Sequence, residues 1–233
     1  MRHVYQNHVL DSTRWNNVRL RDDDIIITTS YKLVPPGCRQ SWAASYSGAG
    51  VDAPISEFSP FLELRMNPLE LVLTGLKRRS NRRFIKTHLP LVGFSFDPRL
   101  KYIQVGRDVH DVFMSFWNHY RPFTDETMLL MNLIPGRSGG PLPPCPEDVH
   151  ELWRKWITRG WFEWETEGYA WWSNLHNVQS WWDYRQLKNI LFVHYSDLLA
   201  DLEGEIRRIA HFLGIEVPDG AGRLSCVTVR SRR

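Results

Sequence analysis

Three short apolar runs constrain the fold of this chain most strongly. They occupy residues 25–29, 102–105 and 190–193. Each run is rich in β-branched or aromatic residues and is bounded by charged or turn residues. This pattern is typical of buried strands that are covered on both faces, as in a parallel sheet.

Helical patterns follow the second and third runs. Apolar residues recur at steps of three and four over residues 109–117, and Asp108 is a predicted N-cap. A second apolar stripe extends over residues 198–213 and predicts one amphipathic helix that ends at Gly214. The repeated order of strand, turn and helix predicts a three-layer α/β/α fold around a central parallel sheet.

Two segments do not fit regular structure. Residues 134–146 hold five Pro and three Gly, which predicts a loop. Residues 33–50 follow the first predicted strand, where a helix is expected, yet they contain two consecutive prolines followed by a glycine. We nevertheless expect residues 1–233 to form a single domain, because 42% of the chain is hydrophobic and 24% is charged.

Charge and cysteine content restrict the function classes. A net charge of +3 permits an anionic ligand but lacks the concentrated basic stripe of a nucleic-acid-binding protein. Three cysteines without metal-ligand spacing indicate a reducing compartment, and residues 1–20 lack the apolar core of a signal peptide. No apolar run reaches the roughly 18–20 residues that span a bilayer. We therefore expect a cytoplasmic protein without a transmembrane segment.

Aromatic residues concentrate in one region. Eight of the 11 tryptophans lie between Trp153 and Trp182, which predicts a large aromatic core or an apolar pocket. We interpret the Trp pairs at 171–172 and 181–182 as core. The neighbouring Glu163, Glu165 and Glu167 are interpreted as a solvated face.

Charged residues follow the predicted strands. The carboxyl ends of parallel strands meet at one edge of a sheet, where turn N–H groups and helix N-termini bind phosphate or sulfate groups. Lys32 follows the first strand and Arg107 the second. Residues 83–90 add Lys86 and His88, which lie on the same side of an extended segment because strand side chains alternate. The set predicts an anion site with a base beside it.

Several segments together resemble the cytosolic sulfotransferases, which use 3′-phosphoadenosine-5′-phosphosulfate (PAPS). Residues 82–91 are similar to the family's Lys-Thr-His-Leu-Pro segment. Residues 101–120 are similar to its 3′-phosphate segment, with Arg107 and Ser115 eight residues apart as that motif requires. Residues 168–199 resemble the region that ends in the Tyr-Glu-Asp signature, although Ser196 replaces the Glu. The order and spacing of these segments make the resemblance specific.

The resemblance implies a role for each residue. His88 would be the general base, and Lys86 would steady the transferring group. Arg107 and Ser115 would bind the 3′-phosphate of PAPS, and Tyr195 would lie against the nucleotide. Lys32 occupies the place of the lysine in the 5′-phosphosulfate loop. The partner would be a small-molecule or lipid acceptor with a hydroxyl group; no metal is implied, and the oligomeric state stays open.

The chain departs from the family directly after Lys32. Two consecutive prolines cannot supply the N–H groups of a phosphosulfate loop, since proline has none. Residues 33–53 and 220–233 can both be back-translated so that another frame restores family-like sequence. We therefore expect both segments to be out of frame and poorly ordered, the chain to be truncated at its C-terminus, and the activity to be impaired.

Three functions remain open from the sequence alone. The first is a PAPS-dependent sulfotransferase, and the second is a non-catalytic remnant of one that no longer binds the donor. The third is a P-loop kinase that acts on ATP, which the absence of a G-x-x-x-x-G-K-[ST] motif disfavours.

Overall fold

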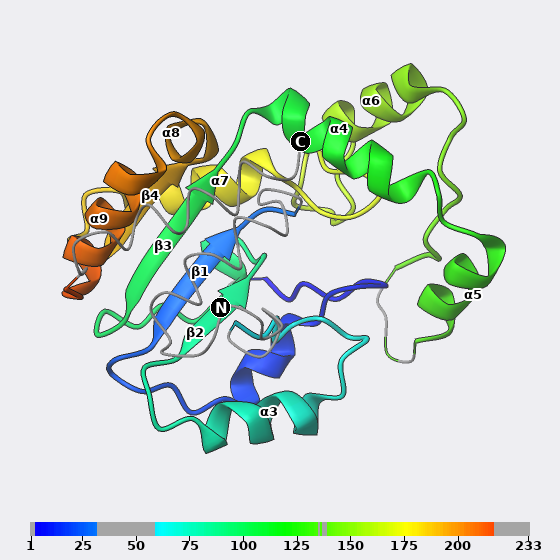
Figure 1. Cartoon of the computed structure of the whole chain (residues 1–233). Helices are drawn as coiled ribbons and strands as arrows, with labels where there is room; N and C mark the ends of the chain where they lie inside the picture. The colour runs from blue at the N-terminus through cyan, green and yellow to red at the C-terminus, as the bar shows by residue number, and fades with distance from the viewer. Residues whose placement is uncertain (1–2, 32–58, 135, 137–138, 217–233) are drawn as a thin grey trace.

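Four parallel strands lie at the centre of the computed structural model, which describes residues 3–31, 59–134, 136 and 139–216 (Figure 1). The strands are β1 (Ile25–Thr29), β2 (Phe84–Thr87), β3 (Lys101–Gly106) and β4 (Ile190–His194). The α-helices are α3 (Leu69–Arg78), α4 (Val109–Tyr120), α5 (Asp125–Leu133), α6 (Val149–Thr158), α7 (Leu175–Trp182), α8 (Tyr195–Ala200) and α9 (Leu202–Leu213). Two 3₁₀ turns, η1 (Ser12–Asn17) and η2 (Leu91–Gly93), complete the described elements.

The sheet order is β2-β1-β3-β4, and every neighbouring pair is parallel. The three runs identified in the sequence are β1, β3 and β4, with each boundary within one residue of the expected position. β2 lies inside the extended segment 83–90 and ends at Thr87. The prediction of a central parallel sheet is therefore confirmed.

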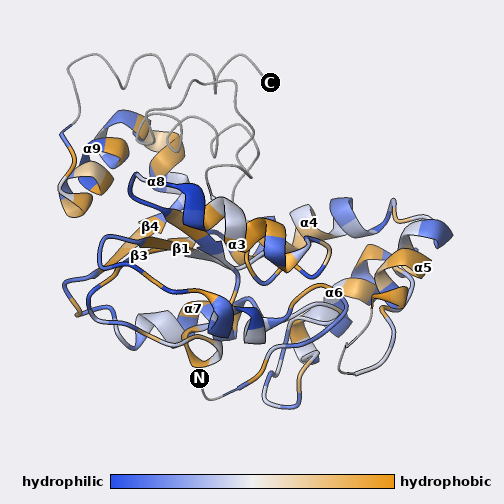
Figure 2. Cartoon of the chain, turned by 90° about the horizontal axis from the view of Figure 1, so that it is seen from below, coloured by the Kyte–Doolittle hydropathy of each residue, from blue (hydrophilic) through white to orange (hydrophobic). Residues whose placement is uncertain are grey.

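Alternate side chains of the strands pack against different helices, which produces three layers. Ile25 and Ile27 of β1 belong to a core cluster that includes Leu198 of α8 and Ile209 of α9. Ile26 faces the other way and joins a cluster with α3 and α7. Figure 2 shows the apolar strands between α8 and α9 on one side and α7 on the other. The predicted α/β/α layering is confirmed, because both faces of the sheet need apolar cover.

The apolar stripe at residues 198–213 forms two helices instead of the single helix that we predicted. α8 ends at Ala200, and Asp201 takes a non-helical backbone conformation with φ of −143° and ψ of 81°. The Asp201 carboxylate accepts a hydrogen bond of 2.9 Å from the N–H of Gly204 and so caps α9. Gly214 ends α9 in the left-handed conformation, with φ of 69°, as predicted.

Some of the sequence predictions fall on residues that the structure does not describe. Lys32 and the segments 33–53 and 220–233 lie outside the described residues. Within the described part of residues 134–146, no helix or strand is present, as the prolines predicted. Among the described helices, none combines the length and the apolar character needed to cross a membrane.

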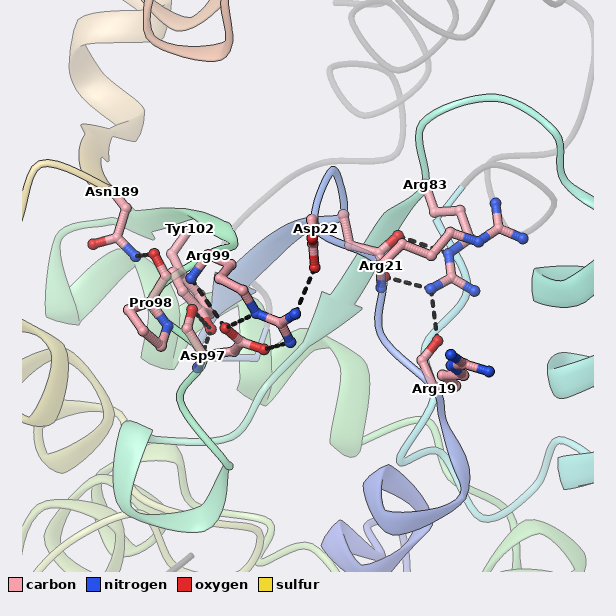
Figure 3. A network of polar contacts seen from close by, with 10 residues as sticks. Arg19, Arg21, Asp22, Arg83, Asp97, Pro98, Arg99, Tyr102 and Asn189 are labelled. Carbon is pink, nitrogen blue, oxygen red and sulfur yellow. Dashed lines mark hydrogen bonds and ion pairs between the residues drawn. The ribbon is translucent and has the colours of Figure 1, made fainter.

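A buried ion pair of Arg83 and Asp24 fixes the amino edge of the sheet, where Figure 3 labels Arg83. The Arg83 guanidinium donates to both carboxylate oxygens of Asp24, and its Nε–Oδ1 distance is 2.7 Å. Asp24 precedes β1 and Arg83 precedes β2, and both side chains are almost fully buried. Asp24 also accepts from the Arg21 N–H at 2.8 Å. The pair therefore sets the register in which β1 and β2 begin.

We expect Asp24→Asn to lower the free energy of unfolding by about 3–5 kcal/mol, because it leaves a buried guanidinium without its counter-charge. The matched control is Asp22→Asn. Asp22 pairs with Arg99 at 2.8 Å, but these side chains are 74% and 62% exposed, so the expected loss is much smaller than for Asp24→Asn. Urea denaturation of the two variants measures the difference, and equal losses would contradict the assignment.

Candidate functional site

The carboxyl ends of all four strands meet at one edge of the sheet. Thr28 of β1 pairs with Thr87 of β2 and with Gln104 of β3, and Gly106 of β3 pairs with His194 of β4. The four segments that follow the strands therefore all start at the same edge of the sheet. The residues that follow the strands are Ser30 and Tyr31 after β1, His88 after β2, Arg107 after β3 and Tyr195 after β4.

His88 is held in place on three sides. Its Nδ1 lies 2.7 Å from the carbonyl oxygen of Thr29. Its main-chain N–H donates to Glu63 at 2.6 Å, and its carbonyl accepts from the Asn177 side-chain amide at 2.9 Å. A carbonyl only accepts hydrogen bonds, so Nδ1 must carry the proton. In the neutral ring Nε2 is then the proton acceptor.

Lys86 and His88 lie around one aromatic ring, that of Phe61. The Lys86 Nζ is 5.2 Å from the centroid of the Phe61 ring. The His88 ring meets Phe61 edge to face, with centroids 4.5 Å apart. Phe61 also forms a parallel bridge with Lys86, which brings residue 61 beside β2. Both side chains thus contact the same ring, in keeping with the expected alternation along the extended segment.

Arg107 and Tyr195 come together at the ends of β3 and β4. The Arg107 guanidinium lies 4.8 Å from the centroid of the Tyr195 ring, a cation–π contact. The Arg107 Nε also lies 3.3 Å from Asp111 on the first turn of α4. Ser115 is partly buried on α4, four residues after Asp111 and therefore on the same helix face. Asp108 caps α4 as predicted, accepting from two N–H groups.

These residues form two groups on either side of β1. His88 and Lys86 belong to the β2 side, whereas Arg107, Ser115 and Tyr195 belong to the side of β3 and β4. β1 lies between them and is followed by Ser30 and Tyr31. The edge therefore offers cations and a histidine around the carboxyl end of the central strand, an arrangement suited to an elongated anionic ligand.

Aromatic side chains form the wall beside His88. The Trp172 ring lies 5.9 Å from the His88 ring, and Tyr31 meets Trp172 edge to face at 5.0 Å. The Tyr31 hydroxyl accepts a hydrogen bond from the Trp156 indole. Trp171, Trp172 and Trp181 are buried in core clusters, as we predicted for the Trp pairs. Trp182 is the exception, because it is 47% exposed.

The interpretation of three glutamates as a solvated face is wrong for two of them. Glu163 is exposed, but Glu165 and Glu167 are buried. Glu167 accepts from the main-chain N–H groups at the start of α7, including that of Leu175 at 2.9 Å. The unpaired N–H groups and dipole of a helix N-terminus stabilise a carboxylate there. Glu165 accepts from the Ser173 N–H at 3.0 Å.

The sequence also left three residues of the site without a role: Phe61, Glu63 and Asn177. Phe61 forms a bridge with Lys86, and Glu63 lies in the turn that follows it. A single Glu among apolar residues does not show in the sequence what it binds. Asn177 reaches the site because α7 packs beside the segment after β2. Ser180 of the same helix accepts a hydrogen bond of 2.9 Å from the Leu91 N–H.

Comparisons with known proteins identify the family of this chain. A model described as the sulfotransferase domain matches residues 44–227. A glycolipid sulfotransferase of Mycobacterium tuberculosis is 32% identical over 91% of this chain and 69% of its own length. Sulfotransferase 1A1 of Mus musculus is 26% identical, over 84% of this chain and 62% of its own length. The fold and the site thus define a sulfotransferase-type α/β protein.

The chain belongs to the sulfotransferase domain family. Solved structures share its fold. Retinol dehydratase, crystallised with androsterone and the inactive cofactor PAP, superposes with a TM-score of 0.66 at 22% identity, covering 93% of this chain and 67% of its own. A mouse sulfotransferase complexed with PAP gives 0.61 at 21% identity, covering 95% and 68%.

Neither the expected frameshifts nor the expected C-terminal truncation is borne out. The family model aligns with residues 44–227, so it includes residues 44–53 of the first segment and 220–227 of the second. Most amino acids have several codons, so a favourable alternative frame can be composed for many short segments. An alternative reading frame is therefore weak evidence for a frameshift, and the expectation of impaired activity loses this support.

Burial raises the pKa of Glu165 from 4.5 to about 8. A carboxyl group whose pKa is higher in the folded state contributes fully to the free energy of unfolding below pH 4.5. This contribution is lost as the pH rises from 4.5 through 8. We expect the unfolding free energy of the natural protein to fall relative to that of Glu165→Gln by at most about 1.4 kcal/mol per pH unit in this window. Urea denaturation between pH 5 and 8 measures it; parallel pH profiles would contradict the prediction.

Proposed function

We propose that this protein transfers a sulfuryl group from PAPS to the hydroxyl group of an acceptor. The observation that carries the proposal is the state of His88. Its Nδ1 proton is committed to the Thr29 carbonyl at the carboxyl edge of the sheet, which leaves Nε2 as the proton acceptor. A neutral imidazole in this tautomer is suited to act as a general base at neutral pH.

The proposed reaction replaces one bond to sulfur with another. The acceptor oxygen attacks the sulfur atom of PAPS, and its proton passes to Nε2 of His88. A bond forms between the acceptor oxygen and sulfur, while the bond between sulfur and the phosphate oxygen breaks and PAP leaves with its electron pair. Lys86 supplies positive charge near the transferring group, where charge on the bridging oxygen needs stabilisation. Its position beside the same Phe61 ring as His88 supports this role.

The donor's adenosine end is assigned to the other group of residues. Arg107 and Ser115 would bind the 3′-phosphate, since a guanidinium and a hydroxyl are both donors to phosphate oxygens. The contact between Arg107 and the Tyr195 ring gives the nucleotide side a cation and an aromatic face together. Lys32 would reach the 5′-phosphosulfate. Two family structures crystallised with PAP support a PAPS-type donor.

The acceptor is proposed to be a small molecule or lipid that carries a hydroxyl group. The mycobacterial relatives are named glycolipid sulfotransferases, and retinol dehydratase was crystallised with a steroid, androsterone. The buried aromatic residues next to His88 offer an apolar wall that suits such molecules. We also propose a cytoplasmic location, because the cysteine pattern favours a reducing compartment.

The test of the proposal combines calorimetry with a transfer assay. The full chain is titrated with PAP and, separately, with ATP and magnesium, and is then assayed with PAPS and a hydroxyl acceptor such as a phenol, a steroid or a glycolipid. Tight PAP binding and PAPS-dependent transfer are expected. Binding of PAP without transfer would indicate impaired chemistry and overturn the proposed activity. Absence of PAP binding would indicate a remnant, and preference for ATP would indicate a kinase.

Replacing His88 with Gln is expected to lower kcat by about 10²–10⁴-fold, which is the usual contribution of a general base. The Kd for PAP is expected to change little, because His88 lies on the β2 side of the site. The control is His211→Gln, since His211 is an exposed residue of the last turn of α9. Steady-state kinetics and calorimetry measure both effects; an unchanged kcat in His88→Gln would exclude the base.

Replacing Arg107 with Gln is expected to weaken PAP binding by roughly 10–150-fold, because a charge-assisted hydrogen bond contributes about 1.5–3 kcal/mol. The matched control is Arg99→Gln. Arg99 carries the same charge and pairs with Asp97 at 2.7 Å, but it lies at the amino edge of the sheet. Calorimetry measures the Kd for PAP of both variants. Equal Kd values would contradict the assignment of Arg107 to the donor site.

A further inference from the structure

Glu63 is a fully buried carboxylate whose oxygens accept three hydrogen bonds. Its Oε1 accepts from the Thr87 hydroxyl and from the His88 main-chain N–H, each at 2.6 Å. Its Oε2 accepts from the Trp15 indole N–H at 3.1 Å. Two of the three donors therefore belong to consecutive residues at the carboxyl end of β2.

The position of these bonds matters because β2 stops at Thr87. From His88 onward the chain no longer has the regular pairing that fixes a strand. Glu63 supplies a partner for the first N–H beyond the strand, while Asn177 holds the carbonyl of the same residue at 2.9 Å. The backbone of His88 is thus fixed at both its N–H and its C=O, which sets the direction of its side chain.

Glu63 is itself held by elements far from the edge. The main-chain carbonyl of Glu63 accepts from the Asp11 N–H at 2.9 Å, and Arg14 donates to the carbonyl of Leu64 at 2.5 Å. The neighbouring residue Phe61 bridges to Lys86 of β2. Residues 60–65 therefore lie between the N-terminal region and β2, and the Glu63 carboxylate meets the end of that strand.

We propose that Glu63 is a positioning residue for His88: it fixes the main chain at Thr87 and His88 so that Nδ1 meets the Thr29 carbonyl and Nε2 remains the proton acceptor. Its catalytic consequence rests on the proposed sulfuryl transfer, whereas the effect on the histidine ring does not. Glu63 acts through His88 and needs no contact with a substrate.

The first experiment reads the tautomer of His88 without any ligand. A long-range ¹H–¹⁵N correlation spectrum of protein labelled with ¹⁵N-histidine distinguishes protons on Nδ1 from protons on Nε2, and His88→Gln assigns the signal. We expect the natural protein to hold the proton on Nδ1 and Glu63→Ala to show a mixture of both tautomers. Glu63→Gln, which retains an acceptor oxygen, is expected to restore most of the natural pattern.

A second route avoids dependence on one variant. Thr87→Val removes the hydroxyl that donates to Glu63, whereas Thr87→Ser keeps it. The valine variant is expected to shift the His88 tautomers in the same direction as Glu63→Ala, and the serine variant is not. A folded Glu63→Ala or Thr87→Val protein with the natural tautomer would overturn the proposal.

The kinetic experiment separates positioning from general stabilisation. Glu63→Ala is expected to lower kcat by about 100-fold, the effect of a displacement of about 1 Å in a catalytic group, with the Kd for PAP within about twofold. Glu63→Gln is expected to lose less than about tenfold. The control is Glu165→Gln, a buried glutamate that bonds Ser173 instead of the β2 segment. A loss of thermal stability with unchanged kcat for the folded protein would contradict positioning.

The two hypotheses fail in different ways. If the natural protein transfers no sulfuryl group, the proposed function is wrong, and the tautomer spectrum still decides the role of Glu63. If transfer is robust but Glu63→Ala retains the natural kcat and tautomer, only the positioning role is wrong.

Discussion

The alignment of four parallel strands is the constraint on which the rest of this structure depends. Because β2, β1, β3 and β4 run in the same direction and in register, the segments that leave them start at one level. His88, Arg107 and Tyr195 are distant in sequence, yet each follows a strand end. The amino edge is fixed by the buried pair of Asp24 and Arg83, which leaves the carboxyl edge open for chemistry.

Buried carboxylates connect this framework to the site. Glu63 and Glu167 are both buried: Glu63 accepts from the His88 N–H and from two side chains, and Glu167 accepts from main-chain N–H groups at the start of α7. Glu63 bonds the N–H of His88, and Glu167 bonds the start of α7, the helix that carries Asn177 to the His88 carbonyl. Burying a charged group without partners is costly, so each carboxylate restricts the positions of the donors around it. The position of the His88 main chain is thus set by Glu63 and Asn177, which lie on other segments.

The sequence predicted the parts of the fold that arise from local periodicity. β1, β3 and β4 stand where short apolar runs occur, and α4 begins after the predicted cap at Asp108. The prediction of a single helix over residues 198–213 was wrong. The apolar stripe continues past Asp201, but the helical backbone is interrupted there. Glu165 was misassigned for a related reason: an alternating series of charges in an irregular segment does not indicate which side is covered by other elements.

The sequence by itself determined the strand–turn–helix order, the apolar faces and the presence of cations and a histidine after strands. These follow from residue type and spacing within one segment. Only the tertiary structure decided that Phe61 lies between Lys86 and His88, that Arg107 meets Tyr195, and that Glu63 bonds the end of β2. Such contacts join residues far apart in the chain. The sequence does not predict them, because the donor that meets a buried acceptor depends on how the layers pack together.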